Sequence, residues 1–126
     1  MKLICRSEIQ AKTLSNTPVR KKLFKIGQAY IALALKIEPF IGPSVLIEVE
    51  EGVIVWAELV GFECETSVLC RDWDFHQFGK ETWCGPKSWM YTAFFRDLEK
   101  SKPIATKLFE EEKQKTHQQE INSPWH

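Results

Sequence analysis

The chain has 126 residues, of which 44% are apolar and 27% charged, and its formal net charge at pH 7 is zero. These values are typical of an ordinary soluble domain. No apolar run approaches the ~20 residues that a membrane-spanning helix needs, and the first ten residues lack the apolar core of a signal peptide. We therefore expect a cytoplasmic protein whose four cysteines remain thiols.

Charge is distributed unevenly along the chain. Residues 1–36 carry eight Lys or Arg against one Glu, whereas residues 37–65 carry seven Glu and no basic residue. Residues 66–126 are balanced. This segregation indicates either two solvated faces that attract each other or one face that meets a charged partner.

The segment 18–37 is predicted to form a helix. Thr17 can cap it, Pro18 fits its first position, and apolar residues recur at steps of three and four with lysines on the opposite face. An alternative remains open, because residues 29–38 also alternate as a strand would, with Gly27 near the start.

Two strands are predicted in the middle of the chain. Segments 44–50 and 53–62 are rich in β-branched and large apolar residues, and Glu51-Gly52 between them is typical of a tight hairpin turn. Residues 67–70 can add a third strand. Connections this short require the strands to be antiparallel.

A stretch rich in aromatic residues follows, from 71 to 89. Pro86 and a helically spaced apolar stripe then predict a helix over 87–100, and a second helical segment starts near Ile104. From residue 110 the chain is almost entirely polar, which is typical of a solvated helix end or a flexible tail.

Together these patterns predict one α+β domain over residues 1–109, followed by a polar helix end or tail over 110–126. The core would be a small antiparallel meander, about 44–70, packed with helices near 18–37 and 87–100. If the alternative strand forms, the sheet gains a member and becomes more like a small barrel.

The motif WCGP at residues 83–86 resembles the active site of thioredoxins, and the resemblance extends over residues 83–100. It implies a thiolate nucleophile at Cys84 and a second, resolving cysteine three positions later. Lys87 occupies that position, and no strand is predicted after the motif to build the thioredoxin sheet. We therefore interpret the motif as the start of a helix.

Two other kinds of chemistry have weaker signals. Three thiols and an imidazole are suitable zinc ligands, but none of them form the close pair that structural zinc sites use. Acidic residues also crowd the same stretch as a cysteine and a histidine, yet no local signature brings them together. We expect neither a metal, nor another cofactor, nor catalytic activity. The candidate zinc ligands are Cys64, Cys70, His76 and Cys84; the acidic residues are Asp72, Asp74 and Glu81.

The function expected from the sequence is that of a small accessory or regulatory protein that binds a protein partner. Exposed aromatic side chains often anchor interfaces, and segregated charge orients a charged partner. One alternative is a nucleic-acid-binding module that uses the basic face of 18–37; another is an enzyme or redox protein that uses Cys84. The residues predicted to carry binding are Lys21, Lys25, Lys36, Trp73, Phe75 and Trp83.

Overall fold

The computed structural model describes residues 1–65, 73–91 and 93–121. Within these ranges the strands form two antiparallel sheets, sheet A in the order β4-β1-β8 and sheet B in the order β3-β2-β7-β6-β5-β10-β9. The strands are β1 (Lys2–Cys5), β2 (Ala11–Lys12), β3 (Pro18–Val19), β4 (Ala29–Ile31), β5 (Ala34–Glu38), β6 (Gly42–Glu50), β7 (Val53–Glu58), β8 (Phe62–Cys64), β9 (Trp73–Phe78) and β10 (Glu81–Pro86). The helices are α1 (Phe94–Glu99) and α2 (Pro103–Ile121), with 3-10 turns η1 (Leu59–Gly61) and η2 (Lys87–Trp89).

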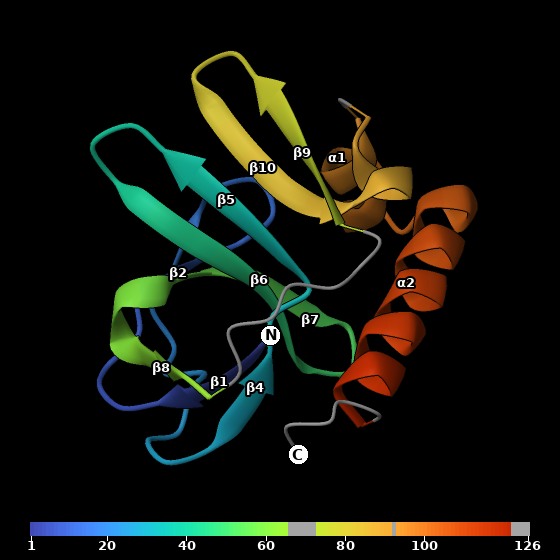
Figure 1. Ribbon diagram of the computed structural model, residues 1–126. Helices are drawn as coiled ribbons and strands as arrows, with labels where there is room; N and C mark the ends of the chain where they lie inside the picture. The colour runs from blue at the N-terminus through green and yellow to red at the C-terminus, as the bar shows by residue number, and fades with distance from the viewer. Residues whose placement is uncertain (66–72, 92, 122–126) are drawn as a thin grey trace.

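The molecule has three layers, with sheet B in the middle. One core lies between sheet A and sheet B and includes Leu3, Tyr30 and Val45. The other lies between the opposite face of sheet B and the two helices, and it contains Trp89 and Phe109. Figure 1 shows α2 along one side of the sheets and the small sheet on the other. The expected class, α+β with antiparallel strands, is therefore correct, although the fold is richer in strands than predicted.

The predicted hairpin in the middle of the chain is confirmed. Strands β6 and β7 pair in antiparallel register, with Leu46 opposite Trp56. Gly52 closes the turn with a φ of 81°, a conformation that glycine adopts without a steric penalty. The predicted third strand, 67–70, lies outside the described residues.

The predicted helix over 18–37 is wrong. The segment contains three strands instead, β3, β4 and β5, with extended chain and turns over residues 20–28. The alternation across 29–38 is the pattern that prevails, because β4 pairs with β1 and β5 pairs with both β6 and β10. Between them, the Ala32 N–H donates to Met1 and the Leu33 N–H donates to Leu46, so the chain passes here from sheet A to sheet B.

Although residues 29–38 are mainly strand, sheet B does not become a barrel. In the described part of the chain its end strands, β3 and β9, each have one neighbour, β2 and β10 respectively. The sheet therefore stays open, and its outer strand β9 presents a free edge.

The predicted helix over 87–100 is correct only in its second half. Residues 83–86 belong to β10 and not to a helix start, and η2 is followed by a break before α1. Helix α2, in contrast, begins at Pro103, one residue before the predicted start near Ile104, and continues to Ile121. None of the helices in the described ranges is long and apolar enough to cross a membrane.

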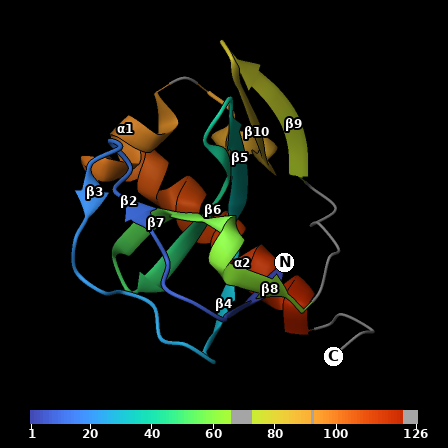
Figure 2. The same ribbon diagram turned by 90° about the vertical axis from the view of Figure 1, so that its left-hand side faces the viewer.

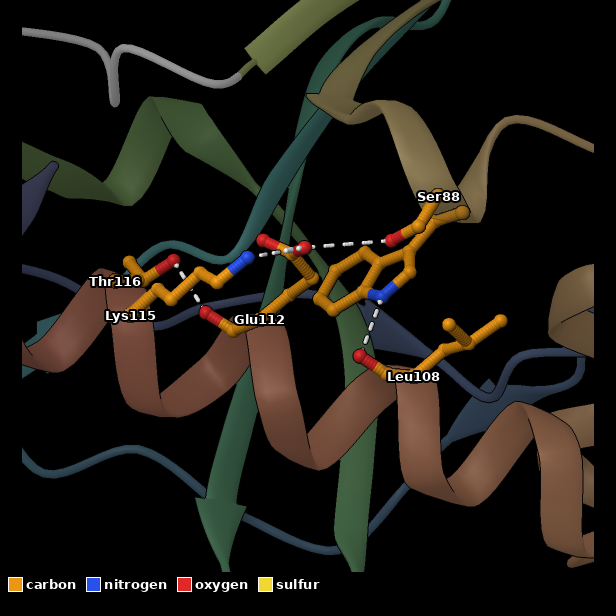
Figure 3. A network of polar contacts seen from close by, with 6 residues as sticks. Ser88, Leu108, Glu112, Lys115 and Thr116 are labelled. Carbon is orange, nitrogen blue, oxygen red and sulfur yellow. Dashed lines mark hydrogen bonds and ion pairs between the residues drawn. The ribbon is translucent and has the colours of Figure 1, made fainter.

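Helix α2 is joined to η2 by the polar contacts in Figure 3. The Trp89 indole N–H donates to the Leu108 carbonyl at 3.1 Å, and the Ser88 hydroxyl donates to the Glu112 carboxylate at 3.4 Å. The Trp89 ring is fully buried and stacks on Phe94 and Phe109. These contacts fix the helix against the end of β10, and they make Trp89 a core residue.

Candidate functional site

The three lysines predicted to share one basic face do not do so. Lys21 and Lys25 are exposed residues of the segment 20–28, where the Lys25 backbone N–H donates to the Tyr30 hydroxyl at 2.9 Å. Lys36 lies on β5 and only 3% of its surface is exposed. The basic surface is therefore a loop whose cations are Arg20, Lys21, Lys22 and Lys25, and Lys36 belongs to a different environment.

The predicted aromatic residues also separate. The stretch 71–89 contains the hairpin β9–β10, and the pleat directs neighbouring side chains to opposite faces. Trp83 is half-buried against Trp56 and Phe95, and its indole N–H donates to Glu81 at 2.9 Å. Trp83 is thus mainly a packing residue. Trp73 is also half-buried, whereas Phe75 is 65% exposed.

Lys36 forms the floor of a pocket of about 180 Å³ on the helix-bearing side of sheet B. Its ammonium nitrogen lies 3.1 Å from Glu38, 3.4 Å from the Asn16 amide oxygen and 4.5 Å from the centre of the Trp56 ring. A buried ammonium group is tolerated only when it is paired and hydrogen-bonded. These three contacts satisfy that requirement and orient the side chain.

The rest of the pocket is mixed in character. Ser44 and Glu58 reach it from β6 and β7, and Lys12 and Pro18 close it from β2 and β3. Neither Glu58 nor Lys12 forms an ion pair within the described residues. Ile41 stands at the side of the pocket nearest the β5–β6 turn. The pocket can therefore accept a polar group beside an apolar one.

An apolar hairpin tip lies next to the pocket, and the sequence prediction missed it. Strands β5 and β6 pair as far as Glu38 and Gly42, so Phe40 and Ile41 occupy the turn. Phe40 is fully exposed, and Ile41 and Ile37 are 53% and 43% exposed. Phe40 also has a φ of 68°, which is rare for a bulky residue. Figure 1 shows this tip projecting from the molecule beside the tip of the β9–β10 hairpin.

One signal in the sequence marks this tip. The segment PFIGP at 39–43 encloses two large apolar residues between prolines and a glycine, at a turn where small polar residues are usual. If strands flank this segment on both sides, its two apolar residues must lie at an exposed turn. This inference depends on residues 34–38 forming a strand, whereas the sequence prediction favoured a helix there.

Cys84 does not have the environment of a reactive thiol. It is buried in the middle of β10, and burial, followed by the negative charge of Asp74, raises the pKa of its thiol. A reactive cysteine needs the opposite shift. His76 pairs across from Trp83, so it points to the opposite face of the hairpin from Cys84. The thioredoxin-like motif is therefore part of a strand.

The zinc candidates are separated as well. Cys64 is exposed on β8 in sheet A, whereas Cys84 is buried in sheet B. Cys70 and Asp72 lie outside the described residues. Among the residues that the structure describes, there is no group of three or more His, Cys, Asp or Glu side chains placed to hold a metal ion.

Comparison with family models, with curated proteins and with solved structures finds no match to this chain. The function must therefore be inferred from the geometry of the chain itself. In that geometry the two features that stand out are the apolar tip of the β5–β6 hairpin and the Lys36 pocket beside it.

Proposed function

We propose that this chain is a non-enzymatic accessory or regulatory protein of the cytoplasm that binds a protein partner through the tip of the β5–β6 hairpin. The observation that carries the proposal is Phe40, a large apolar side chain that is fully exposed in a left-handed backbone conformation. Ile41 lies next to it in the same turn and is 53% exposed. A hydrophobic anchor of this kind is typical of the centre of an interface.

The energetics of Phe40 support this role. A non-glycine residue in the left-handed region costs about 1 kcal/mol or more, and an exposed phenylalanine gains nothing from folding. Burying its side chain against a partner would stabilise a complex by roughly 1.5–3 kcal/mol. A position that weakens the free protein and strengthens a complex is favoured where binding is the function.

The adjacent pocket adds a polar component to the same surface. Ile41 contributes to both the tip and the pocket, so a partner that covers Phe40 would also reach the region of Lys36 and Glu58. A polar side chain of the partner can enter there, while the apolar tip is buried beside it. The hairpin tip and the pocket together give an apolar centre with a polar region beside it, which is the arrangement common in protein interfaces.

The proposal is tested by comparing variants in a pull-down from the native host with quantitative mass spectrometry. Phe40→Asp and Ile41→Asp should both fold and should lose the partner that the wild type retains. Val60→Asp is the matched control, because Val60 is 87% exposed but lies in η1. With the purified partner, Phe40→Asp should weaken binding at least tenfold by calorimetry, and Val60→Asp should not. Retention of every partner by folded Phe40→Asp and Ile41→Asp would contradict the proposal.

A second candidate function is nucleic-acid binding by the basic loop. Its cations, Arg20, Lys21, Lys22 and Lys25, are all exposed, and none forms an ion pair within the described residues. Buried Phe24 anchors the loop by its edge-to-face contact with Tyr30. Such a loop suits phosphate contacts, whose affinity falls steeply with salt.

This second candidate is tested with mixed single- and double-stranded oligonucleotides at 20–200 mM salt. If the loop binds phosphates, affinity should fall with salt and should be lost in Lys21→Glu/Lys25→Glu, while Phe40→Asp should bind as the wild type does. Absence of binding at the lowest salt concentration would exclude the candidate.

A further inference from the structure

Strand β9 is one of the two edge strands of sheet B in the described part of the chain. Its only neighbour in the described part of the sheet is β10, and the side chains from Asp74 to Gln77 are exposed. Figure 2 shows β9 at the outside of the molecule, with β10 on its inner side. The strand is six residues long, pairs with β10 without a bulge and contains neither proline nor lysine. Natural edge strands usually carry a bulge, a proline or a lysine, because an unprotected edge pairs with other strands.

The backbone groups that face outward from β9 can be identified. In an antiparallel pair, opposite residues alternate between those that exchange hydrogen bonds and those that do not. Pro86 lacks an N–H, so Pro86 and Trp73 do not exchange hydrogen bonds. By alternation, neither do Phe75 and Cys84, nor Gln77 and Thr82. The backbone N–H and C=O groups of Trp73, Phe75 and Gln77 therefore point away from β10. The Phe75 N–H agrees with this assignment, because it donates to the side chain of Asp74 at 3.2 Å.

Phe75 is the middle one of the three residues whose backbone N–H and C=O groups point outward, Trp73, Phe75 and Gln77. We propose that two copies of the chain pair through β9 in antiparallel fashion, with Phe75 of each copy opposite Phe75 of the other. In this register Trp73 lies opposite Gln77 of the second copy, and all three outward-facing residues exchange hydrogen bonds across the edge. The Phe75 N–H then donates to the backbone carbonyl of Phe75 in the second copy and no longer to the Asp74 side chain.

The side chains are complementary in the same register. Asp74 lies opposite His76 of the second copy, and the reverse pair is equivalent by symmetry. A carboxylate thus faces an imidazole that can donate a hydrogen bond to it, at positions where opposite Cα atoms approach most closely. On the other face the two Phe75 rings form a cross-strand aromatic pair, which is a favourable contact in sheets. No other register centred on an outward-facing residue places a carboxylate opposite a histidine.

The dimer should be weak. One short strand pair buries less surface than a standard stable interface of about 1,600 Å², so a dissociation constant on the order of 100 µM is expected. This association is independent of the proposed function, because Phe40 lies on a different hairpin. The two surfaces can therefore be tested separately.

The first test is sedimentation equilibrium of the full chain from 10 µM to 1 mM. The wild type should change from monomer to dimer over this range. Phe75→Asp and Gln77→Pro should each raise the dissociation constant at least tenfold, since the first places two charges opposite each other and the second removes an outward N–H. Phe40→Asp should dimerise as the wild type does. A monomer mass at every concentration, or dimerisation of both β9 variants as strong as that of the wild type, would overturn the proposal.

The second test examines the register itself, in a background of Cys64→Ser and Cys70→Ser. In Phe75→Cys the new thiols lie opposite each other on the two-fold axis, where the Cα separation of about 5.5 Å suits a disulfide. Mild oxidation should therefore give a covalent dimer. Gln77→Cys is the matched control and should crosslink at least tenfold more slowly, because its opposite residue is Trp73. Equal crosslinking of both variants would exclude this register.

Discussion

The ammonium nitrogen of Lys36 lies 4.5 Å above the centre of the Trp56 ring, in a side chain that is almost completely buried. Strands β5 and β7, which carry these two residues, both pair with β6. The cation is therefore held between an aromatic face, the Glu38 carboxylate and the Asn16 amide. This arrangement makes Lys36 part of the structure of the pocket as well as part of its lining.

Lys36→Met should lower the free energy of unfolding by about 3 kcal/mol, because it leaves the largely buried Glu38 carboxylate without its cation. The double variant Lys36→Met/Glu38→Gln removes both charges and should cost only about 1 kcal/mol. Urea denaturation of the wild type, both single variants and the double variant measures the coupling between them. If the losses of Lys36→Met and Glu38→Gln add up to the loss of the double variant, the ion pair contributes nothing to stability.

Phe40→Asn should raise the free energy of unfolding by about 0.5–1 kcal/mol. Asparagine tolerates a positive φ better than phenylalanine, and the fully exposed ring contributes no packing. Thermal and urea denaturation measure the change. Phe75→Asn is the control, because Phe75 is exposed on a strand with ordinary φ, and it should not stabilise the protein. Destabilisation by Phe40→Asn would show that the strain assigned to this turn is absent.

Cys84 should react slowly with iodoacetamide at pH 7–8 in the folded protein. Burial, and secondarily Asp74, raises the pKa of its thiol, so less thiolate is present at these pH values than in an ordinary cysteine. Exposed Cys64 should react faster. Peptide mapping after timed labelling distinguishes the two sites, and unfolding in urea should remove the difference. Faster labelling of Cys84 than of Cys64 would restore the case for a reactive thiol.

Lys113 should contribute to stability in a pH-dependent way. Burial alone would lower its pKa, but hydrogen bonds to Glu110 and Glu48 outweigh burial, and the pKa is raised. A group whose pKa is higher in the folded state stabilises the protein below its unfolded pKa and loses this contribution as pH rises through the folded value. Lys113→Met should therefore cost about 1–2 kcal/mol at pH 7, and the difference from wild type should shrink above pH ~10.5.

The control for that prediction is Lys107→Met. Lys107 is 4.0 Å from Glu111 on the exposed side of α2, and its side chain is 77% exposed. Removing it should change the unfolding free energy by less than about 0.5 kcal/mol at any pH. An equal loss in both variants would mean that the contact of Lys113 with Glu48 on β6, at 2.9 Å, does not fasten α2 to the sheet.

The sequence alone determined the elements whose signals are local. Strands β6 and β7 were predictable because β-branched residues flank a turn that needs glycine at Gly52. The start of helix α2 near Ile104 was predictable because Pro103 interrupts the preceding helix and Leu108 and Phe109 then provide apolar contacts. The tertiary structure decided the segment 18–37, since its apolar spacing fits both a helix and a strand, and pairing with β1, β6 and β10 favours the strand.

The candidate site was decided almost entirely by tertiary structure. Nothing local to Lys36 predicts that Trp56, twenty residues away, will cover it, because that contact depends on both strands pairing with β6. The exposure of Phe40 likewise depends on 34–38 being a strand and not a helix. Residue composition predicted an aromatic protein with segregated charge, but only the sheet order determined which of those side chains are buried and which are exposed.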